Sequence, residues 1–218
     1  MADLAFIPPM LPTLVSELPE GNDWIHEIKY DGWRTQVVVD NGAARVFTCN
    51  GHDWTLQFAP VAAAAPMLGH DRLILDGEMI VDGPDGKPDY QALRRLVKSS
   101  PAAMRFVAFE ILHLDNQDLT GMALDERRHL LEDAVTPAVE PIRFSESFAG
   151  TGAEFFAAIE HMDLEGMVSK QADGTYASGR TRAWLKTKSF VEATYDIIGV
   201  QRESCAARRS CGVPWSED

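Results

Sequence analysis

The chain has 218 residues, of which 45% are hydrophobic and 24% charged, and this composition is that of a globular protein with one domain or one domain plus a fragment of another. Its three cysteines form no paired framework and no apolar run reaches the length of a membrane span, which excludes a disulfide-stapled domain, a cysteine zinc site and a transmembrane protein. The formal net charge of -13 argues against tight binding of nucleic acid by this chain alone, because a duplex is bound through Lys and Arg.

The N-terminal part of the chain predicts an extended segment, a strand and a hairpin. Residues 1–14 lack the basic start and apolar middle of a signal peptide, so we expect a soluble, monomeric protein of the cytoplasm with no membrane partner. Prolines make residues 6–19 an extended segment over the surface. Residues 24–29 (WIHEIK) alternate as a half-buried strand does, and the β-branched residues 34–40 lead through an Asn-Gly pair into a returning strand at residues 43–48.

The middle of the chain alternates between helical and strand patterns. Residues 54–68 predict an alanine-rich helix, and residues 73–81 (LILDGEMIV) predict an apolar strand that two acidic residues interrupt. Residues 90–98 are helical and basic on one side, which is typical of a solvated helix face. Residues 106–112 (FVAFEIL) predict a buried strand.

The last predicted elements are two helices and short strands. Residues 125–135 open with an Asp cap and continue as an amphipathic helix, and residues 154–161 form another helix. Residues 166–169 and 183–188 predict short strands, and residues 196–200 (DIIGV) start like one. Strands and helices mix without a regular βαβ order, which favours an α+β fold of antiparallel sheets over a doubly wound fold.

Charged residues interrupt the apolar segments of this pattern, and burying a charge is costly unless it is paired or binds an ion. If they converge, five cations and four anions form a cleft that neutralises itself, and its natural occupant is a nucleoside triphosphate, an anion that carries a metal ion. The residues are Lys29, Asp31, Arg34, Asp76, Glu78, Glu165, Lys170, Lys186 and Lys188.

Five short motifs in this order resemble those of covalent nucleotidyltransferases, the superfamily of DNA ligases, RNA ligases and mRNA capping enzymes. Residues 29–34 (KYDGWR) fit the KxDGxR signature, and residues 75–78 (LDGE) look like the DGE motif. Residues 106–112 resemble the aromatic strand, residues 165–170 (EGMVSK) the EGxVxK motif, and residues 184–188 (WLKTK) the closing WLKxK motif. The sequence around them is most similar to bacterial ATP-dependent DNA ligases of the end-joining type. One such motif is weak evidence, but five in order are strong.

This resemblance implies an ATP-grasp-like nucleotidyltransferase domain, in which antiparallel sheets flanked by helices hold the nucleotide in a cleft between them. Lys29 is then the nucleophile that takes AMP from ATP as a covalent lysyl adenylate. Lysine pKa values fall readily near other cations, and Lys186 and Lys188 supply such cations and bind the α-phosphate. Glu165 and Glu78 are the expected ligands of Mg²⁺ or Mn²⁺, and Glu165 is the better metal ligand of the two.

The resemblance also implies how the nucleoside is bound. Arg34, together with the glutamate of the DGE motif, holds the ribose hydroxyls. Glu27 lies near the amino group of adenine, Phe109 stacks on one face of the base, and Met167 or Val168 closes the other face. Without the motifs, an aromatic residue in such a strand is more often part of the core than a base platform.

Two departures from the family pattern qualify the function. Cys49 stands where these ligases usually carry an arginine that recognises the 5′-phosphate of a nick, and Glu110 replaces an aspartate. Residues 1–190 are expected to form the adenylation domain, and residues 191–218 a linker or the truncated start of an OB-fold domain that is otherwise absent. We therefore expect nicked DNA to be the partner of the complete enzyme and to bind weakly here.

Two alternatives to a DNA ligase remain open on the sequence. The first is an RNA ligase or capping-type nucleotidyltransferase, which shares the motifs. The second is a degenerate, non-catalytic paralogue that binds nucleotide, which the acidic charge and Cys49 would fit but the intact motif lysines and glutamates argue against.

Overall fold

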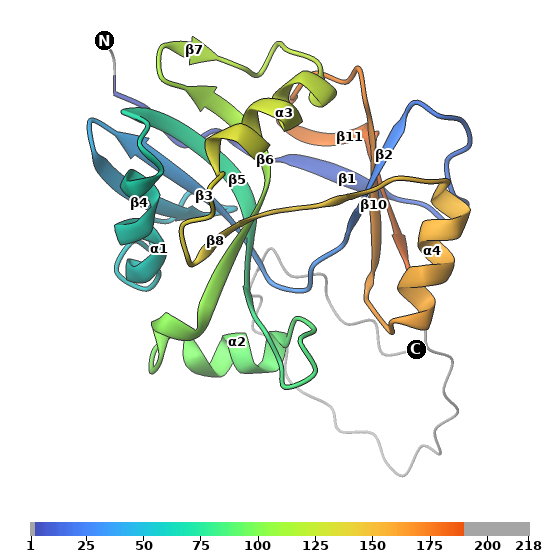
Figure 1. Cartoon of the computed structure of the whole chain (residues 1–218), viewed down its shortest axis with the longest axis horizontal. Helices are drawn as coiled ribbons and strands as arrows, with labels where there is room; N and C mark the ends of the chain where they lie inside the picture. The colour runs from blue at the N-terminus through green and yellow to red at the C-terminus, as the bar shows by residue number, and fades with distance from the viewer. Residues whose placement is uncertain (1–2, 190–218) are drawn as a thin grey trace, which may run out of the picture.

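The computed structural model describes residues 3–189, which form two β-sheets packed against each other, with helices on the outer face of each (Figure 1). Within these residues, sheet A has five strands in the order β1-β11-β10-β2-β9 and sheet B has six strands, ordered β4-β3-β5-β6-β7 with β8 beside β6. The strands of sheet A are β1 (Met10–Leu14), β2 (Trp24–Ile28), β9 (Ser147–Phe148), β10 (Gly166–Gln171) and β11 (Gly179–Lys188). The strands of sheet B are β3 (Trp33–Asp40), β4 (Ala43–Thr48), β5 (Arg72–Val81), β6 (Met104–Leu114), β7 (Gln117–Asp118) and β8 (Ile142–Phe144).

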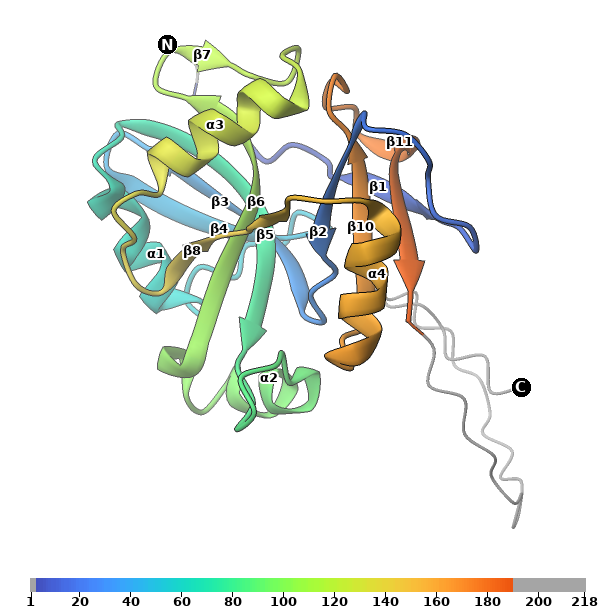
Figure 2. The ribbon, with the colours of Figure 1, turned by 45° about the vertical axis from the view of Figure 1, so that its right-hand side comes forward.

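The helices α1, α3 and α4 lie against the outer faces of the sheets, and α2 lies at the lower end of β5 and β6, as the turned view shows (Figure 2). The first three contact sheet B, and α4 contacts β2 and β10 of sheet A. Their bounds are α1 (Ala59–Ala64), α2 (Tyr90–Leu96), α3 (Leu124–Ala134) and α4 (Gly152–His161). No helix among residues 3–189 is long and apolar enough to cross a membrane.

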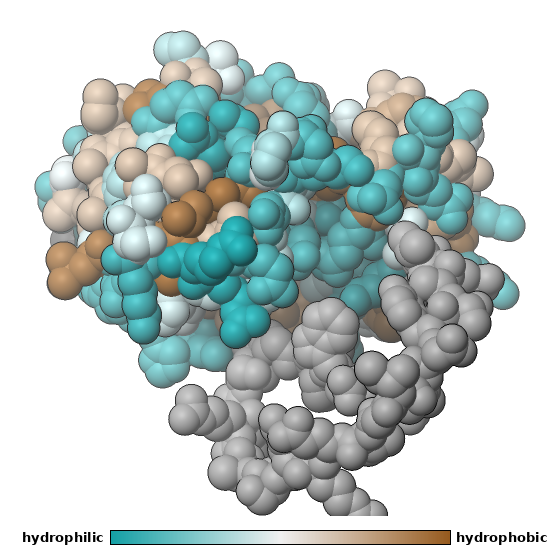
Figure 3. Space-filling view, turned by 90° about the horizontal axis from the view of Figure 1, so that it is seen from below, coloured by the Kyte–Doolittle hydropathy of each residue, from teal (hydrophilic) through white to brown (hydrophobic). Residues whose placement is uncertain are grey.

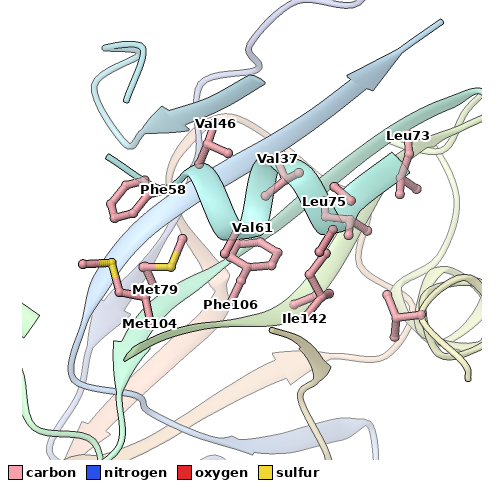
Figure 4. Packing of buried hydrophobic residues seen from close by; sticks show 14 of the residues in the cluster. Val37, Val46, Phe58, Val61, Leu73, Leu75, Met79, Met104, Phe106 and Ile142 are labelled. Atoms are coloured by element: carbon pink, nitrogen blue, oxygen red, sulfur yellow. The ribbon is translucent and has the colours of Figure 1, made fainter. Parts of the chain in front are cut away.

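Alternation along the strands of sheet B divides the hydrophobic core into two parts. Val37 and Val39 point toward the helices, whereas Val38 between them packs in the layer between the two sheets. The helix-side part is the larger one (Figure 4), and it includes Val46, Phe58, Val61, Leu73, Leu75, Met79, Met104, Phe106 and Ile142. The layer between the sheets includes Met10, Ile74, Leu112, Tyr176 and Trp184. The predicted α+β fold is confirmed, because each sheet buries one face on helices and the other on its partner sheet.

Two predicted segments differ in detail from the structure. The proline-rich stretch at residues 6–19 was expected to lie extended over the surface; within it, β1 is extended but also pairs with β11 as a parallel edge strand. The helix expected at residues 54–68 begins only at Ala59, with a proline in its first turn, and ends in a 3₁₀ turn at Ala65–Leu68 that also contains a proline. A proline has no backbone N–H and starts a helix more readily than it continues one, so the pattern overestimated the length of this helix.

The third helix begins one residue before the predicted aspartate cap. Its N-cap is Ala123, with no side-chain hydrogen bond, and Asp125 lies in the first turn, where its charge still favours the helix N-terminus. The sheets are mostly antiparallel, as expected, with two parallel pairs, β1 with β11 and β6 with β8. The expected strand at residues 196–200 and the expected segment 191–218 lie outside the described residues.

Candidate active site

Lys29 lies directly after β2, where two hollows between the sheets meet. An inner cavity of about 170 Å³ extends into the layer between the sheets, and an outer cleft of about 740 Å³ opens beside α2. The inner cavity is lined by Pro12, Glu27, Ile28, Lys29, Tyr30, Arg34, Glu78, Phe109, Val168, Lys170, Trp184 and Lys186. The outer cleft is lined by Lys29, Asp31, Gly83, Pro84, Asp85, Lys87, Pro88, Asp89, Tyr90, Gln91, Asp163, Leu164 and Glu165. Hydrophilic residues predominate on the face that carries α2, seen from below (Figure 3).

Lys29 is held by the neighbouring strand β10 and the loop before it. Its backbone N–H donates to the carbonyl of Gly166 at 2.9 Å. Its Nζ pairs with Oε2 of Glu165, while Nζ of Lys188 lies 3.6 Å from Oε1 of the same carboxylate. These side chains remain partly exposed, at 20% for Lys29 and 26% for Glu165. The amine is therefore fixed but accessible from the hollows.

Three lysines form a cationic group at this junction. Lys186 lines the inner cavity beside Lys29, and Lys188 follows it on the same face of β11. Burial lowers the pKa of Lys186 first, and the charges of Lys29 and Lys188 lower it further. A group of amines that repel one another in a half-buried site favours a bound anion with several negative charges.

Two carboxyl groups near Lys29 are shifted toward the protonated form. Burial raises the pKa of Glu78 to about 8, although the charges of Lys29 and Arg34 act in the opposite direction. Burial and the nearby charge of Glu165 likewise raise the pKa of Asp31. The acidic groups are therefore crowded around the lysines, as expected for a site that neutralises itself.

The raised pKa of Glu78 predicts a pH-dependent stability. The unfolded side chain ionises near its ordinary pKa, whereas the folded one keeps its proton up to about pH 8, so the wild type loses stability as pH rises through this window. Glu78→Gln removes this loss. We expect its free energy of unfolding, relative to wild type, to increase from pH 5 to pH 9 by at least about 1.4 kcal/mol, the equivalent of one pKa unit. Urea unfolding without nucleotide or divalent metal measures this difference, and a difference that stays constant over the whole pH range would contradict the prediction.

The aromatic floor of the inner cavity is formed by β6 and β11. The rings of Phe109 and Trp184 meet edge to face, with centroids 6.1 Å apart. The Nζ of Lys170 lies 4.7 Å from the Phe109 centroid and 4.5 Å from the Trp184 centroid, within the range of cation–π attraction. Phe109 thus lines the inner cavity, and Cζ of Arg34 also lies 5.1 Å from its ring centroid.

Val168, rather than Met167, lines the inner cavity. Met167 is fully buried on the opposite face of β10, where it packs against Phe155 and Ile159 of α4. Neighbouring residues of a strand point to opposite faces, so only one of the two candidates could reach the cavity. The part of the prediction that named Met167 as a base contact is corrected in this way.

Glu27 is bound on both of its carboxylate oxygens. Oε1 lies 2.6 Å from Nη1 of Arg128 and 2.6 Å from Nζ of Lys170, and Oε2 accepts a hydrogen bond from the hydroxyl of Ser145 at 2.8 Å. The residue is only 2% exposed but lines the inner cavity. It is therefore an anchored acceptor in the cavity wall.

Arg34 also lines the inner cavity, and it is held by a buried ion pair. Its Nε and Nη2 donate to the two carboxylate oxygens of Asp76 at 3.0 and 2.7 Å, and Nη1 donates to the carbonyl of Met10 at 2.6 Å. The hydroxyl of Tyr176 donates to the same Asp76 at 2.7 Å. This arrangement leaves Arg34 few free N–H groups for a ligand, but it fixes their direction.

The two arginines of α3 were not among the site residues predicted from the sequence. Arg127 and Arg128 are both buried, and each contacts a carboxylate of a sheet. The signal was present, because these arginines follow Leu124 by three and four residues and precede Leu131, so they occupy the apolar stripe of the helix. A charged residue on the apolar face of a helix is buried when the helix packs, so it needs a partner of opposite charge.

Residues 9–188 match the family model of the ATP dependent DNA ligase domain. The chain is 34% identical over 209 residues to the multifunctional non-homologous end joining protein LigD of Pseudomonas aeruginosa. This match covers 95% of this chain and 25% of that protein. It is 32% identical over 208 residues to a DNA ligase of Natronomonas pharaonis, and this match covers 91% of this chain and 38% of that protein.

The fold is similar to that of a solved mycobacterial DNA ligase D complexed with ATP and MES. The TM-score is 0.75 at 31% identity, and the match covers 83% of this chain and 59% of that one. A second solved structure, the ligase domain of Mycobacterium tuberculosis LigD, matches with a TM-score of 0.72 at 30% identity, over 83% of this chain and 58% of that one. The chain thus spans about a quarter of the length of the P. aeruginosa relative and somewhat more than half of the solved ligase domains.

Proposed function

Because this chain belongs to the ATP-dependent DNA ligase domain family, we propose that Lys29 takes AMP from ATP as a covalent lysyl adenylate. One observation carries the proposal: Lys29 lies where the inner cavity and the outer cleft meet, beside two further lysines. A nucleoside in the inner cavity would place its α-phosphate near the Lys29 amine and its outer phosphates toward the cleft. The resemblance of the surrounding motifs supports the same assignment.

In the proposed reaction, the lone pair on Nζ of Lys29 attacks the α-phosphorus in line with the leaving group. An N–P bond forms, the bond between the α-phosphorus and the bridging oxygen of the β-phosphate breaks, and pyrophosphate leaves through the outer cleft. The ammonium of Lys29 loses one proton to solvent before the attack, and the attacking nitrogen loses a second one as the N–P bond forms, so the product is a neutral phosphoramidate nitrogen. Lys186 and Lys188 offset the negative charge that builds on the α-phosphate.

The nucleoside is proposed to bind in the inner cavity. Phe109 offers a ring for stacking and Val168 a second apolar contact. Arg34 and Glu78 line the same cavity and are assigned to the ribose hydroxyls. Glu27 is assigned to the amino group of adenine, because its carboxylate is held in the wall of this cavity.

Glu165 and Glu78 are the residues proposed to hold a divalent cation, Mg²⁺ or Mn²⁺. Both lie beside the proposed nucleophile, which supports this role: Glu165 pairs with Nζ of Lys29, and Glu78 lines the inner cavity with the same lysine. Among residues 3–189, no three His, Cys, Asp or Glu side chains form a complete set of metal ligands, so the phosphates and water would complete the coordination. A bound ion supplies positive charge that neutralises the triphosphate.

In a complete ligase, the AMP on Lys29 is proposed to pass to the 5′-phosphate of nicked DNA before the 3′-hydroxyl seals the nick. We propose that this chain alone binds nicked DNA weakly, in keeping with its net charge of -13 and with Cys49 at the place of an expected phosphate-binding arginine. The names of the relatives, which include end-joining, DNA repair and DNA ligase proteins, support a role in DNA repair, and we propose that the protein acts there as a monomer in the cytoplasm.

Incubation of the purified chain with α-labelled ATP and magnesium tests the proposal. We expect label that stays on the denatured protein and is released by pyrophosphate, which reverses the reaction. Little label is expected from α-labelled GTP, which separates the ligase assignment from a capping activity. Wild-type protein that binds ATP but retains no label after denaturation would contradict the proposed function and favour a non-catalytic nucleotide-binding protein.

A further inference from the structure

We propose that Arg128 is a positioning residue for base selection: it holds the Glu27 carboxylate in one orientation, so that the inner cavity accepts the 6-amino group of adenine and rejects a 6-carbonyl. The inference rests on the proposed function, because it assumes that the base of the nucleotide enters the inner cavity. Arg128 itself does not line the cavity and acts only through Glu27.

The contacts of Arg128 join α3 to the cavity wall at two points. Nη1 donates to Oε1 of Glu27 at 2.6 Å, and Nη2 donates to the carbonyl of Ser145 at 2.9 Å. The guanidinium also lies 4.9 Å from the ring centroid of Phe144. These three neighbours fix the plane of the guanidinium, and Arg128 therefore holds the Glu27 carboxylate in one orientation.

The hydroxyl of Ser145 fixes the second oxygen of the carboxylate. The carbonyl of Ser145 accepts from Arg128 while its hydroxyl donates to Oε2 of Glu27 at 2.8 Å, so Arg128, Ser145 and Glu27 form a closed ring of contacts. Lys170 adds a second cation on Oε1 at 2.6 Å. Both oxygens of the Glu27 carboxylate therefore have partners, and these contacts oppose its rotation toward a different ligand.

The remaining capacity of Glu27 determines what it can recognise. A carboxylate offers about four acceptor positions and no donor. Arg128 and Lys170 occupy Oε1, and Ser145 occupies one position of Oε2, which leaves about one acceptor position on Oε2. An N–H of the 6-amino group of adenine satisfies it. The 6-carbonyl of hypoxanthine or guanine would instead place a second acceptor against it, and neither the carbonyl oxygen nor Oε2 would gain a hydrogen-bond donor.

A purely structural role is the competing explanation, because the ion pair between Arg128 and Glu27 also joins α3 to sheet A. The adjacent residue separates the two roles. Arg127 is also buried, lies on the same helix and pairs with Glu110, but neither Arg127 nor Glu110 lines the inner cavity. Loss of Arg127 therefore disturbs the packing of α3 without releasing Glu27.

The test compares ATP with inosine triphosphate, which carries a carbonyl in place of the 6-amino group. The test variants are Arg128→Met and the milder Ser145→Ala. Their matched controls are Arg127→Met and Ser169→Ala, since Arg127 pairs with Glu110 and the Ser169 hydroxyl lies 2.9 Å from Nδ1 of His26. For each protein, the specificity constant of covalent labelling is measured with both nucleotides, and equilibrium affinity for both is measured by calorimetry without divalent metal.

We expect Arg128→Met to lower the preference for ATP over inosine triphosphate by about tenfold or more, and Ser145→Ala to lower it severalfold, because each change frees the carboxylate to turn. The controls should keep the wild-type preference. An unchanged preference in Ser145→Ala and in folded Arg128→Met, or an equal loss in the controls, would overturn the inference while labelling of the wild type still supports the proposed function. Absence of label with an Arg128-dependent binding preference would overturn the proposed function instead.

Discussion

Lys29→Arg is expected to abolish covalent labelling by ATP while leaving the fold intact. The guanidinium keeps the positive charge that pairs with Glu165, but it stays protonated at any pH that the protein tolerates and has no lone pair for attack on phosphorus. We expect the rate of labelling to fall by at least about a thousandfold, the order of loss that follows removal of a catalytic nucleophile. Gel autoradiography or intact-protein mass after incubation with ATP and magnesium measures the effect.

Lys87→Arg is the matched control for this substitution. Lys87 lines the same outer cleft and pairs with Asp163 at 3.5 Å, yet no step of the proposed reaction uses it. Its labelling rate should stay within about twofold of wild type, since surface substitutions away from a site have small effects. Equal labelling of the wild type and Lys29→Arg would place the nucleophile elsewhere.

Arg127→Met is expected to destabilise the protein strongly. The side chains of Arg127 and Glu110 are fully buried, and Nε and Nη2 donate to the two carboxylate oxygens at 2.9 and 2.7 Å. Removing the arginine leaves a buried carboxylate without its charge partner, which costs about 3–5 kcal/mol of the free energy of unfolding. Two further hydrogen bonds from Arg127, to the carbonyls of Met122 and Gly174, are lost as well.

Urea unfolding measures the loss, and two further proteins test its cause. The double variant Arg127→Met with Glu110→Leu removes both charges and should recover most of the lost stability, because no unpaired charge remains. Lys87→Met breaks an exposed pair with Asp163 instead and should cost no more than about 1 kcal/mol. If the single and the double variant were equally unstable, packing rather than the unpaired charge would explain the loss.

The local sequence determined the strands and the chemical character of the site. The β-branched residues 34–40 and the Asn-Gly pair after them predicted β3. The motif around Lys29 predicted a lysine in a cleft with other charged residues, and Lys29 lines the inner cavity with Arg34 and Glu78. The sequence alone predicted these features because β-branched composition, turn residues and motif spacing are properties of residues that are close together in the chain.

The partners of the buried charges were decided only by the tertiary structure. Arg128 and Glu27 are 101 residues apart in the chain, and Val168 rather than Met167 lines the cavity because of the side of β10 that faces sheet B. The pairing of β1 with β11 likewise joins segments 169 residues apart at Met10 and Gly179. A sequence pattern shows that a charge or an apolar side chain will be buried, but which group it meets depends on how the two sheets and α3 pack, and that packing is a property of the whole fold.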